Sequence, residues 1–488
     1  MSEAIGAEIV AGEIDPIPAP TEKKQSKYDR SIVQGPLGRA VWKIAWPAML
    51  TNIIGGFQGI IDHALVGNLV GYTGNAAIGV SVQLWIVVIV FISSIFIGMS
   101  VLVARFAGAG EEEKVNRTVY QAFLTAIFMS FCILAPVGYF AAPYLLDLVN
   151  TAPEVKAEAL PFLRIMYVFS GGMLVFFMLG GALRSAGDAR TPLLLGIVMT
   201  VLNLVFNVVL IRGLGPIPAF GTMGSAMGTS IASGLIAIYA LWRLWSGGWV
   251  VSFPRGGSYA PDWAVIRKLF KFGLPAGIQG IAMNVGGVLL LSFIGSLAHS
   301  AAAQAAYAVS YVQLFSLITW TSMGLMGAAA SVAGQNLGAG HPDRTNTAVH
   351  VAARFGMIGS AFIGFFFFFF PQQMLGLFGM TDPAVVEIGT QLLRVLAFSG
   401  IFISVALTYT GGLQGTGDTK GPLYISIISQ VIVPLSICFV INQFGTLEPI
   451  HIWLAILAGH ITRCVLSILR FNQGKWRNIV VSIEQTEG

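Results

Sequence analysis

The sequence predicts an all-α integral membrane protein with twelve transmembrane helices, arranged as two similar six-helix bundles. Three observations lead to this prediction: an apolar composition, recurring apolar stretches of membrane-spanning length, and an internal repeat. Hydrophobic residues fill 55% of the 488 positions and charged residues only 10%, whereas a soluble domain carries roughly 25% charged residues. Most of the chain is therefore expected to lie in a lipid bilayer.

The apolar stretches are close to the length of about 20 residues that a helix needs to cross about 30 Å of hydrocarbon. Six are expected in each half of the chain. In the first half they cover 44–68, 78–104, 119–141, 159–182, 192–212 and 223–245. In the second half they cover 268–295, 303–333, 347–371, 387–411, 422–442 and 450–471. An even number of spans places both termini on one side of the membrane.

Basic residues gather in alternate loops, which indicates the orientation. If the N-terminus is cytoplasmic, the inner loops hold Arg105, Lys114, Arg117, Arg184, Arg190, Arg243, Arg255, Arg267, Lys268, Arg344 and Lys420. Lys and Arg are enriched in cytoplasmic loops, so both termini are predicted to be cytoplasmic and the protein to lie in the cell inner membrane. This distribution also accounts for the net charge of +5, so nucleic acid is not expected as a partner.

The spans divide the chain into five parts. Residues 1–38 are predicted to form a disordered cytoplasmic tail and 39–245 an N-lobe of helices 1–6. Residues 246–266 form a cytoplasmic linker, 267–472 a C-lobe of helices 7–12, and 473–488 a cytoplasmic C-terminal tail.

The internal repeat relates the two lobes. GALRSAGDARTP at 181–192 reappears as GGLQGTGDTKGP at 411–422, an offset of 230, and KIAWPAM at 43–49 resembles KFGLPAG at 271–277, an offset of 228. Since each half has six spans, both enter the membrane from the same side. The lobes should therefore be related by a pseudo-twofold axis along the membrane normal.

The Gly-Asp elements within this repeat have a structural explanation. Gly187 and Gly417 suit a tight turn, and Asp188 and Asp418 suit a helix N-cap. We therefore interpret them as scaffold and not as substrate ligands.

Asp62 is the clearest functional candidate, because an ionisable residue deep in a span is costly to bury. It lies fifteen residues after Pro47, roughly 22 Å along a helix. In the fifth span, Asn203 and Asn207 are four residues apart and share one helix face. Asn207 lies fifteen residues after Pro192, so it reaches the depth of Asp62 if the two helices start level.

These three residues suggest an ion site. One carboxylate facing two amide oxygens offers the oxygen ligands that suit Na⁺, while burial favours the protonated carboxyl group and would make Asp62 a proton carrier. By the repeat offsets their partners in the second half are apolar: Leu290, Val433 and Ile437. The fold alone does not need the polar residues, so Asp62 is predicted to couple to an ion. The two asparagines could instead join helices by hydrogen bonds.

Polar residues in the spans of the second half are weaker candidates, for lining a substrate cavity. Each is as well explained by a helix–helix contact. They are Gln279, Asn284, Gln304, Gln313, Tyr409 and Gln430. Three cysteines within spans and six scattered histidines predict neither a structural metal site nor a cofactor site.

Two six-helix halves, the paired Gly-Asp elements and an acid in the first span resemble the multidrug and toxic compound extrusion (MATE) transporters. The likeness extends from about residue 38 to 472. It implies two bundles forming a V around a central cavity. Asp62 corresponds to the acid in the first span of that family, and Asn203 and Asn207 to polar positions of its fifth span. Thr229, in GSAMGTS, is a candidate for a hydroxyl in its sixth span.

The sequence departs from the family pattern at positions that bear on coupling. Some prokaryotic members have a second acid where this chain has Asn207, and the NorM-like branch has acids in the seventh and tenth spans. No acid occurs within 268–295, and none within 387–411 outside the first residue of that span. The chain therefore resembles the DinF-like branch more closely, with coupling in the N-lobe alone. This favours H⁺, with Na⁺ as the alternative.

The resemblance implies a secondary active efflux transporter, not an enzyme. It would exchange H⁺ or Na⁺ for a small organic substrate, amphipathic and cationic or of multidrug type, by alternating access and as a monomer. A lipid-linked precursor flippase of related fold would need a cationic cavity and usually fourteen spans. Deep arginines, which a cationic cavity would need, are few. A membrane-embedded enzyme would need His or Asp residues clustered at one membrane face, and the histidines are scattered along the sequence instead.

Overall fold

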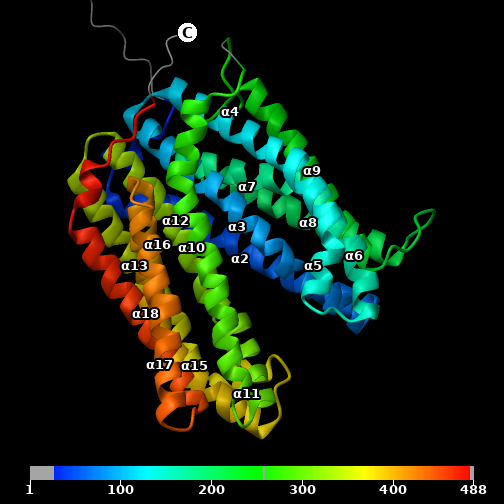
Figure 1. Cartoon of the computed structure of the whole chain (residues 1–488). Coiled ribbons are helices and arrows are strands. Elements are labelled where there is room, and N and C mark those ends of the chain that lie inside the picture. Colours follow the sequence, from blue (N-terminus) through cyan, green and yellow to red (C-terminus); the bar gives the residue numbers. More distant parts are fainter. Residues whose placement is uncertain (1–26, 257–258, 484–488) are drawn as a thin grey trace, which may run out of the picture.

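The computed structural model describes residues 27–256 and 259–483, with the backbone alone for 86–93. Every long element in these ranges is a helix (Figure 1). The first half contains α1 (Ser31–Gln34), α2 (Leu37–Leu69), α3 (Tyr72–Ala109), α4 (Glu112–Phe128), the π-helical turn η1 (Met129–Leu134), α5 (Ala135–Leu148), α6 (Pro153–Val168), α7 (Ser170–Ser185), α8 (Arg190–Arg212) and α9 (Thr222–Ser246).

The second half has the same general plan, but its π-helical turns fall in different spans. It contains α10 (Trp263–Gly295), α11 (Ser300–Tyr307), the π-helical turn η2 (Ala308–Leu314), α12 (Ser316–Gly338), α13 (Pro342–Phe369), α14 (Pro371–Gly376), α15 (Pro383–Thr416), α16 (Lys420–Ser426), the π-helical turn η3 (Ile427–Ile432), α17 (Val433–Phe444), α18 (Pro449–Asn472) and the 3₁₀ turn η4 (Lys475–Asn478).

The predicted spans correspond to these helices. Ten continuous helical segments of the described residues are long and apolar enough to cross a membrane, and the pair α6 and α7 forms a further span that bends by 52°. The 38-residue α3 corresponds to the second predicted span, and its described part is apolar. The chain is therefore a multi-pass membrane protein with the predicted fold class. One predicted span, 347–371, extends two residues beyond the end of α13.

Contacts between the lobes follow the repeat. Gly108 of α3 lies against the backbone of Gln335 in α12, and Gly338 of α12 lies against the backbone of Arg105 in α3. By the offset of 230, Gly108 corresponds to Gly338 and Arg105 to Gln335, so the two contacts are equivalent. Helices α3 and α12 therefore meet at the pseudo-twofold axis. Around it α3 packs on α10 and α2 on α12. Small residues at these crossings let the helix backbones approach closely.

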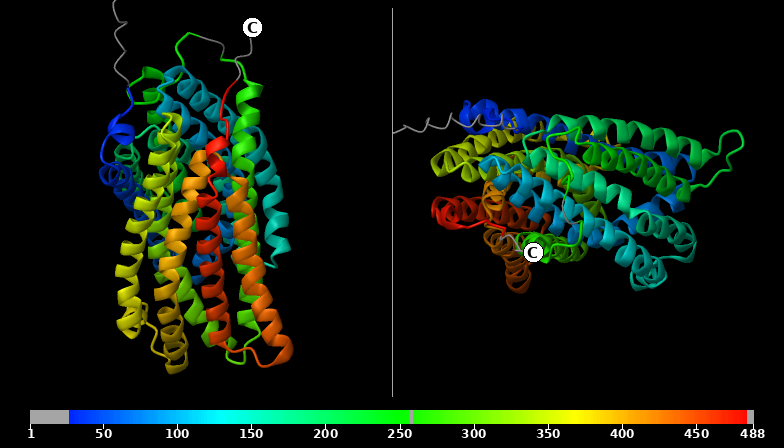
Figure 2. Two further views of the ribbon diagram at one scale, coloured as in Figure 1. Left: turned by 90° about the vertical axis from the view of Figure 1, so that its left-hand side faces the viewer. Right: turned by 90° about the horizontal axis from the view of Figure 1, so that it is seen from above.

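The two bundles meet near the chain ends and diverge from there. Figure 1 shows them inclined to one another and converging at one end. Seen from above in Figure 2, the helices of the first half (blue to green) and those of the second (yellow to red) lie largely on opposite sides. The two lobes therefore form the arrangement expected for a V, closed at the end where the segments before α2 and after α18 contact α3 and α12.

The predicted disorder of the N-terminal tail needs correction, and the C-terminal tail contains ordered structure that was not predicted. Residues 27–38, expected to be disordered, include α1, the buried side chain of Ile32 and the first residues of α2. In the expected C-terminal tail, η4 forms and both Trp476 and Ile483 are buried. Apolar side chains in these short segments find partners on both lobes, which sequence periodicity does not reveal. Residues 1–26 and 484–488 of the predicted tails lie outside the described residues.

Candidate functional site

Four predicted residues meet where α2, α8 and α9 come together in the N-lobe. Asn207 Nδ2 donates hydrogen bonds to Asp62 Oδ1 at 2.7 Å and to Asn203 Oδ1 at 3.2 Å. Asn203 Nδ2 in turn donates to Thr229 Oγ1 at 2.8 Å. The equal depth expected for Asp62 and Asn207 is therefore present, and the four side chains form one hydrogen-bonded chain.

The middle of this hydrogen-bonded series is buried, and the residues at its two ends, Asp62 and Thr229, are half-buried. Asn207 is 0% and Asn203 1% exposed, while Asp62 is half-buried. Within 27–256 and 259–483 no ion pair includes Asp62. The carboxyl group therefore has a neutral amide as its hydrogen-bond donor and no basic side chain to balance its charge.

The orientation of the Asn207 amide follows from its neighbours. Its NH₂ group lies between two oxygen acceptors, and turning the amide would bring its oxygen against both. Asn207 Oδ1 is buried without a hydrogen-bond partner and faces Gly228 of α9, where no side chain would fit. The missing side chain of Gly228 thus leaves the space that the Asn207 amide oxygen occupies. Sequence reasoning missed it, although it directly precedes Thr229.

A second polar pair joins α2 to α8 beside this network. Thr200 Oγ1 donates to Gln58 Oε1 at 3.1 Å, and Gln58 is buried. Gln58 precedes Asp62 by four residues and so shares its helix face. That spacing is the signal by which the sequence could have revealed it. His63, on a different face of α2, contacts Asn75 through Nδ1 at 2.6 Å.

The family model MatE matches the chain twice, over residues 47–209 and 275–440. These two ranges begin 228 residues apart, the offset of the internal repeat, and together they cover more than half of the sequence.

The chain belongs to the MatE family.

Its relatives include multidrug resistance proteins. A probable multidrug resistance protein NorM of Thermotoga maritima is 25% identical over 448 residues, covering 90% of this chain and 93% of that protein. A probable multidrug resistance protein YoeA of Bacillus subtilis is 26% identical over 438 residues, covering 88% and 92%.

Solved structures share the fold. An outward-facing MATE family transporter superimposes with a TM-score of 0.85 at 18% identity, covering 92% of this chain and 99% of that one. A transporter of the MOP superfamily from Pyrococcus furiosus gives 0.82 at 19% identity, covering 93% and 98%.

In this MatE chain, the C-lobe residues equivalent to Asp62, Asn203 and Asn207 are apolar. Two of them are also surrounded by apolar side chains. Leu290 is buried in the main core cluster of the C-lobe, and Ile437 packs against that cluster. The network is thus specific to the first lobe, although the backbone framework is repeated.

The polar residues considered for a substrate cavity do not form one group among the described residues. Gln279 donates to Ser426 Oγ at 2.7 Å and accepts from Gln414 at 3.4 Å. The Tyr409 hydroxyl contacts His350 Nδ1 at 2.6 Å. Both are contacts between helices, the alternative that the sequence left open.

The remaining candidates have less buried surroundings. Asn284 and Gln304 are exposed, and the amide of Asn284 donates to the carbonyl of Gly280 in its own helix. Gln313 is half-buried, as is Gln430, whose Nε2 is buried without a partner. Their role in substrate binding stays a prediction.

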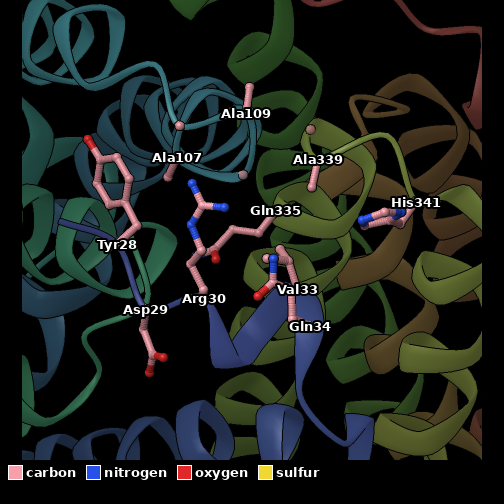
Figure 3. A pocket seen from close by; sticks show the side chains of 13 residues that line it. Tyr28, Asp29, Arg30, Val33, Gln34, Ala107, Ala109, Gln335, Ala339 and His341 are labelled. Atoms are coloured by element: carbon pink, nitrogen blue, oxygen red, sulfur yellow. The ribbon is translucent and has the colours of Figure 1, made fainter. Parts of the chain in front are cut away.

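A cavity of about 310 Å³ lies at the closed end between the lobes (Figure 3). Its walls are the segment around Arg30, the end of α3 at 107–110 and the end of α12 at 335–339. The last two are repeat equivalents, so the cavity lies at the pseudo-twofold axis. Figure 3 shows the Arg30 side chain extending between Ala107 and Gln335. The N-terminal segment therefore covers the seam between the lobes.

Proposed function

We propose that this protein is a secondary active efflux transporter that exchanges H⁺ for a small organic substrate by alternating access. The observation that supports this most directly is the Asp62 carboxyl group, placed within a membrane span, hydrogen-bonded to the buried Asn207 and without an ion pair among the described residues. Such a group changes charge by taking up or releasing one proton, and that change alters the interactions of α2 with α8.

The contacts of Asn207 favour H⁺ over Na⁺. A cation bound between Asp62 and Asn207 would need the amide oxygen, but the amide presents its NH₂ group to the carboxylate. Turning it would also break the bond to Asn203. A proton needs no such change, because the second carboxyl oxygen can carry it while Oδ1 still accepts from the amide. Coupling in the N-lobe alone, as in the DinF-like branch, is part of this proposal.

We propose the following cycle. In the conformation described, the lobes are closed at the terminal end and diverge toward the other (Figure 1). With both termini cytoplasmic in the inner membrane, this is the outward-facing state. Protonation removes the charge of Asp62 and lets α2 repack, aided by Pro47, which removes a backbone hydrogen bond within that helix. Substrate leaves outward, the lobes rock about the α3–α12 contact, and the proton is released inside.

The proposed substrates are amphipathic organic cations, for which the multidrug resistance relatives are the support. We propose that the transporter works as a monomer with no cofactor.

Dye efflux from proteoliposomes tests the proposal. Under an imposed proton gradient the wild type should transport, whereas Asp62→Asn should lose gradient-driven transport by at least tenfold, because an amide cannot carry the proton. Glu154→Gln removes one negative charge from an exposed position and should behave as wild type. A sodium gradient applied without a proton gradient should drive little transport.

Two results would contradict the proposal. Full proton-driven efflux by a well-folded Asp62→Asn protein would show that the carboxyl group is not the coupling site. Transport driven by sodium alone, and lost in Asp62→Asn, would keep the site and replace the ion.

A further inference from the structure

A buried arginine lies in the middle of α18, in the C-lobe. Arg463 is only 2% exposed, and its Nε is buried without a hydrogen-bond partner. It follows Pro449 by fourteen residues and precedes Asn472 by nine, which places it about 21 Å and about 13 Å from the two helix ends. At this depth the guanidinium group cannot reach the membrane surface as arginines near helix ends do.

No protein group within the described residues balances this charge. Arg463 belongs to none of the ion pairs there, and Asp418 pairs at 2.7 Å with Arg470, which is on the same helix as Arg463. The sequence explains why. From residue 263 to 483 all acids lie at or near helix ends: Asp343, Asp382, Glu387, Asp418 and Glu448. An arginine stays charged in proteins, and an unbalanced buried charge strongly destabilises a fold.

The groups that interact electrostatically with Arg463 are His460 and Tyr311, and neither is an acid that ionises near neutral pH. Ser467, one turn further along α18, has a buried hydroxyl oxygen without a partner. His460 contacts Ser399 Oγ through Nδ1 at 2.6 Å. If that hydroxyl donates to Nδ1, the neutral ring carries its proton on Nε2 and offers a second N–H group.

Aromatic rings from η2 and its flanks complete the surroundings. Tyr307 stacks on Tyr311 at 5.0 Å, Tyr311 on Phe315 at 5.4 Å, and Phe315 on His460 at 5.8 Å. η2 is a π-helical turn, a feature that often marks functional positions in helices. The group thus combines one fixed positive charge, several donors and low polarity, which is the environment that strengthens binding of an anion.

We infer that the C-lobe contains a binding site for a small anion, a halide or a carboxylate group, with Arg463 as its countercharge and Ser467 and His460 as further donors. The planar guanidinium group can bind a carboxylate through two parallel hydrogen bonds. Because Arg463 lies well inside the span, a free anion or an anionic group of a small molecule fits better than a lipid phosphate.

The N-lobe does not repeat this group. By the offset of 230, Arg463 corresponds to Ser233 and His460 to Ser230, while Thr229 of the N-lobe network corresponds to Gly459. The two lobes therefore carry polar groups of opposite sign, an acid on α2 in the first lobe and a cation on α18 in the second. The anion site rests on Arg463 and its neighbours alone, so it does not depend on the proposed coupling at Asp62.

Thermal unfolding of the purified full-length protein tests this inference. The protein is placed in nanodiscs of neutral phosphatidylcholine, with sodium chloride, sodium acetate or a bulky sulfonate salt at equal ionic strength. Chloride and acetate should raise the Tm of the wild type by a few degrees in a saturable way relative to the sulfonate. A ligand that binds only the folded state must have this effect.

The variants separate a binding site from a packing role. Arg463→Met should lose the dependence on the anion and, in sulfonate, unfold at or above the Tm of the wild type, because no charge is left unbalanced. Arg463→Lys keeps the charge without the planar fork and should respond to chloride more than to acetate. The matched control Arg394→Gln removes a charge from an exposed position of the same lobe and should keep the full response.

The following results decide the matter. An equal Tm of the wild type in all three salts, or an unchanged anion response in Arg463→Met, would overturn the inference. A further arm replaces part of the neutral lipid by phosphatidylglycerol in the sulfonate buffer. A rise in Tm seen only there, and lost in Arg463→Met, would support an anion site at Arg463 and assign its ligand to a lipid headgroup.

Discussion

At the scale of single residues, Asn207 holds the N-lobe network together, because one NH₂ group serves both Asp62 and Asn203. Its position depends on Gly228, whose missing side chain leaves room for the Asn207 oxygen. A methyl group there would push the amide away from α9 and disturb both of its hydrogen bonds.

Gly228→Ala should therefore reduce proton-driven transport by about tenfold or more and lower the stability by about 1–3 kcal/mol, the usual cost of overpacking. The matched control is Gly234→Ala on the same helix, where a methyl group meets open space. Transport in proteoliposomes and Tm measured side by side check this expectation. Equal transport by the two variants would show that the amide position does not matter.

The sequence was sufficient to predict that Asp62, Asn203 and Asn207 lie close together, because helix rise and a shared helix face give their depth and direction. It did not reveal Gly228, since a glycine among small residues has no signal of its own until the facing helix is known. Arg463 was also missed, although it lies well inside the predicted span 450–471. Its burial depends on how α18 packs against α15 and η2.

At the scale of helices, apolar length predicted each span, while breaks and π-helical turns came only from the structure. The bend between α6 and α7 lies at Phe169, where the helical hydrogen bonds are interrupted. Ser170, Gly171 and Gly172 follow it directly, and such Gly/Ser pairs are common sites of helix kinks. The paired Gly-Asp turns were predictable, because Gly187 and Gly417 both adopt positive φ and Asp188 caps the first turn of α8.

The contact between α3 and α12 yields a prediction for these elements. Gly338 lies directly on the backbone of Arg105, so Gly338→Ala should force the two helices apart at the closed end. The lobes should then open more readily at that end, seen as a larger label-to-label distance or faster thiol labelling there. Gly327→Ala on α12, at an open position, is the control. Identical labelling of both variants would contradict a role for this contact in closure.

At the scale of the whole molecule, each chain end reaches from its own lobe to the other. The N-terminal segment leads into α2 of the N-lobe, yet the carbonyls of Ile32 and Gly35 accept hydrogen bonds from Asn336 at 3.3 Å and Arg344 at 2.8 Å in the C-lobe. The C-terminal segment follows α18 of the C-lobe, and the carbonyl of Ile479 accepts from Arg105 of the N-lobe at 2.6 Å. These reciprocal contacts cross the seam that must open for the inward-facing state.

Removing one of these bridges should favour that state. Deleting residues 479–488 takes away the partner of Arg105 and the buried Ile483, at a distance from the Asp62 network. The truncated protein should populate conformations open at the terminal end several-fold more than the wild type. Spectroscopic distances between labels on the loops after α3 and α12 would measure the population of these open conformations. The same measurement on the truncated protein with Asp62→Asn would separate the effect of the truncation from ion coupling at Asp62. An unchanged distance distribution in the truncated protein would mean that the helix contacts alone keep this end closed.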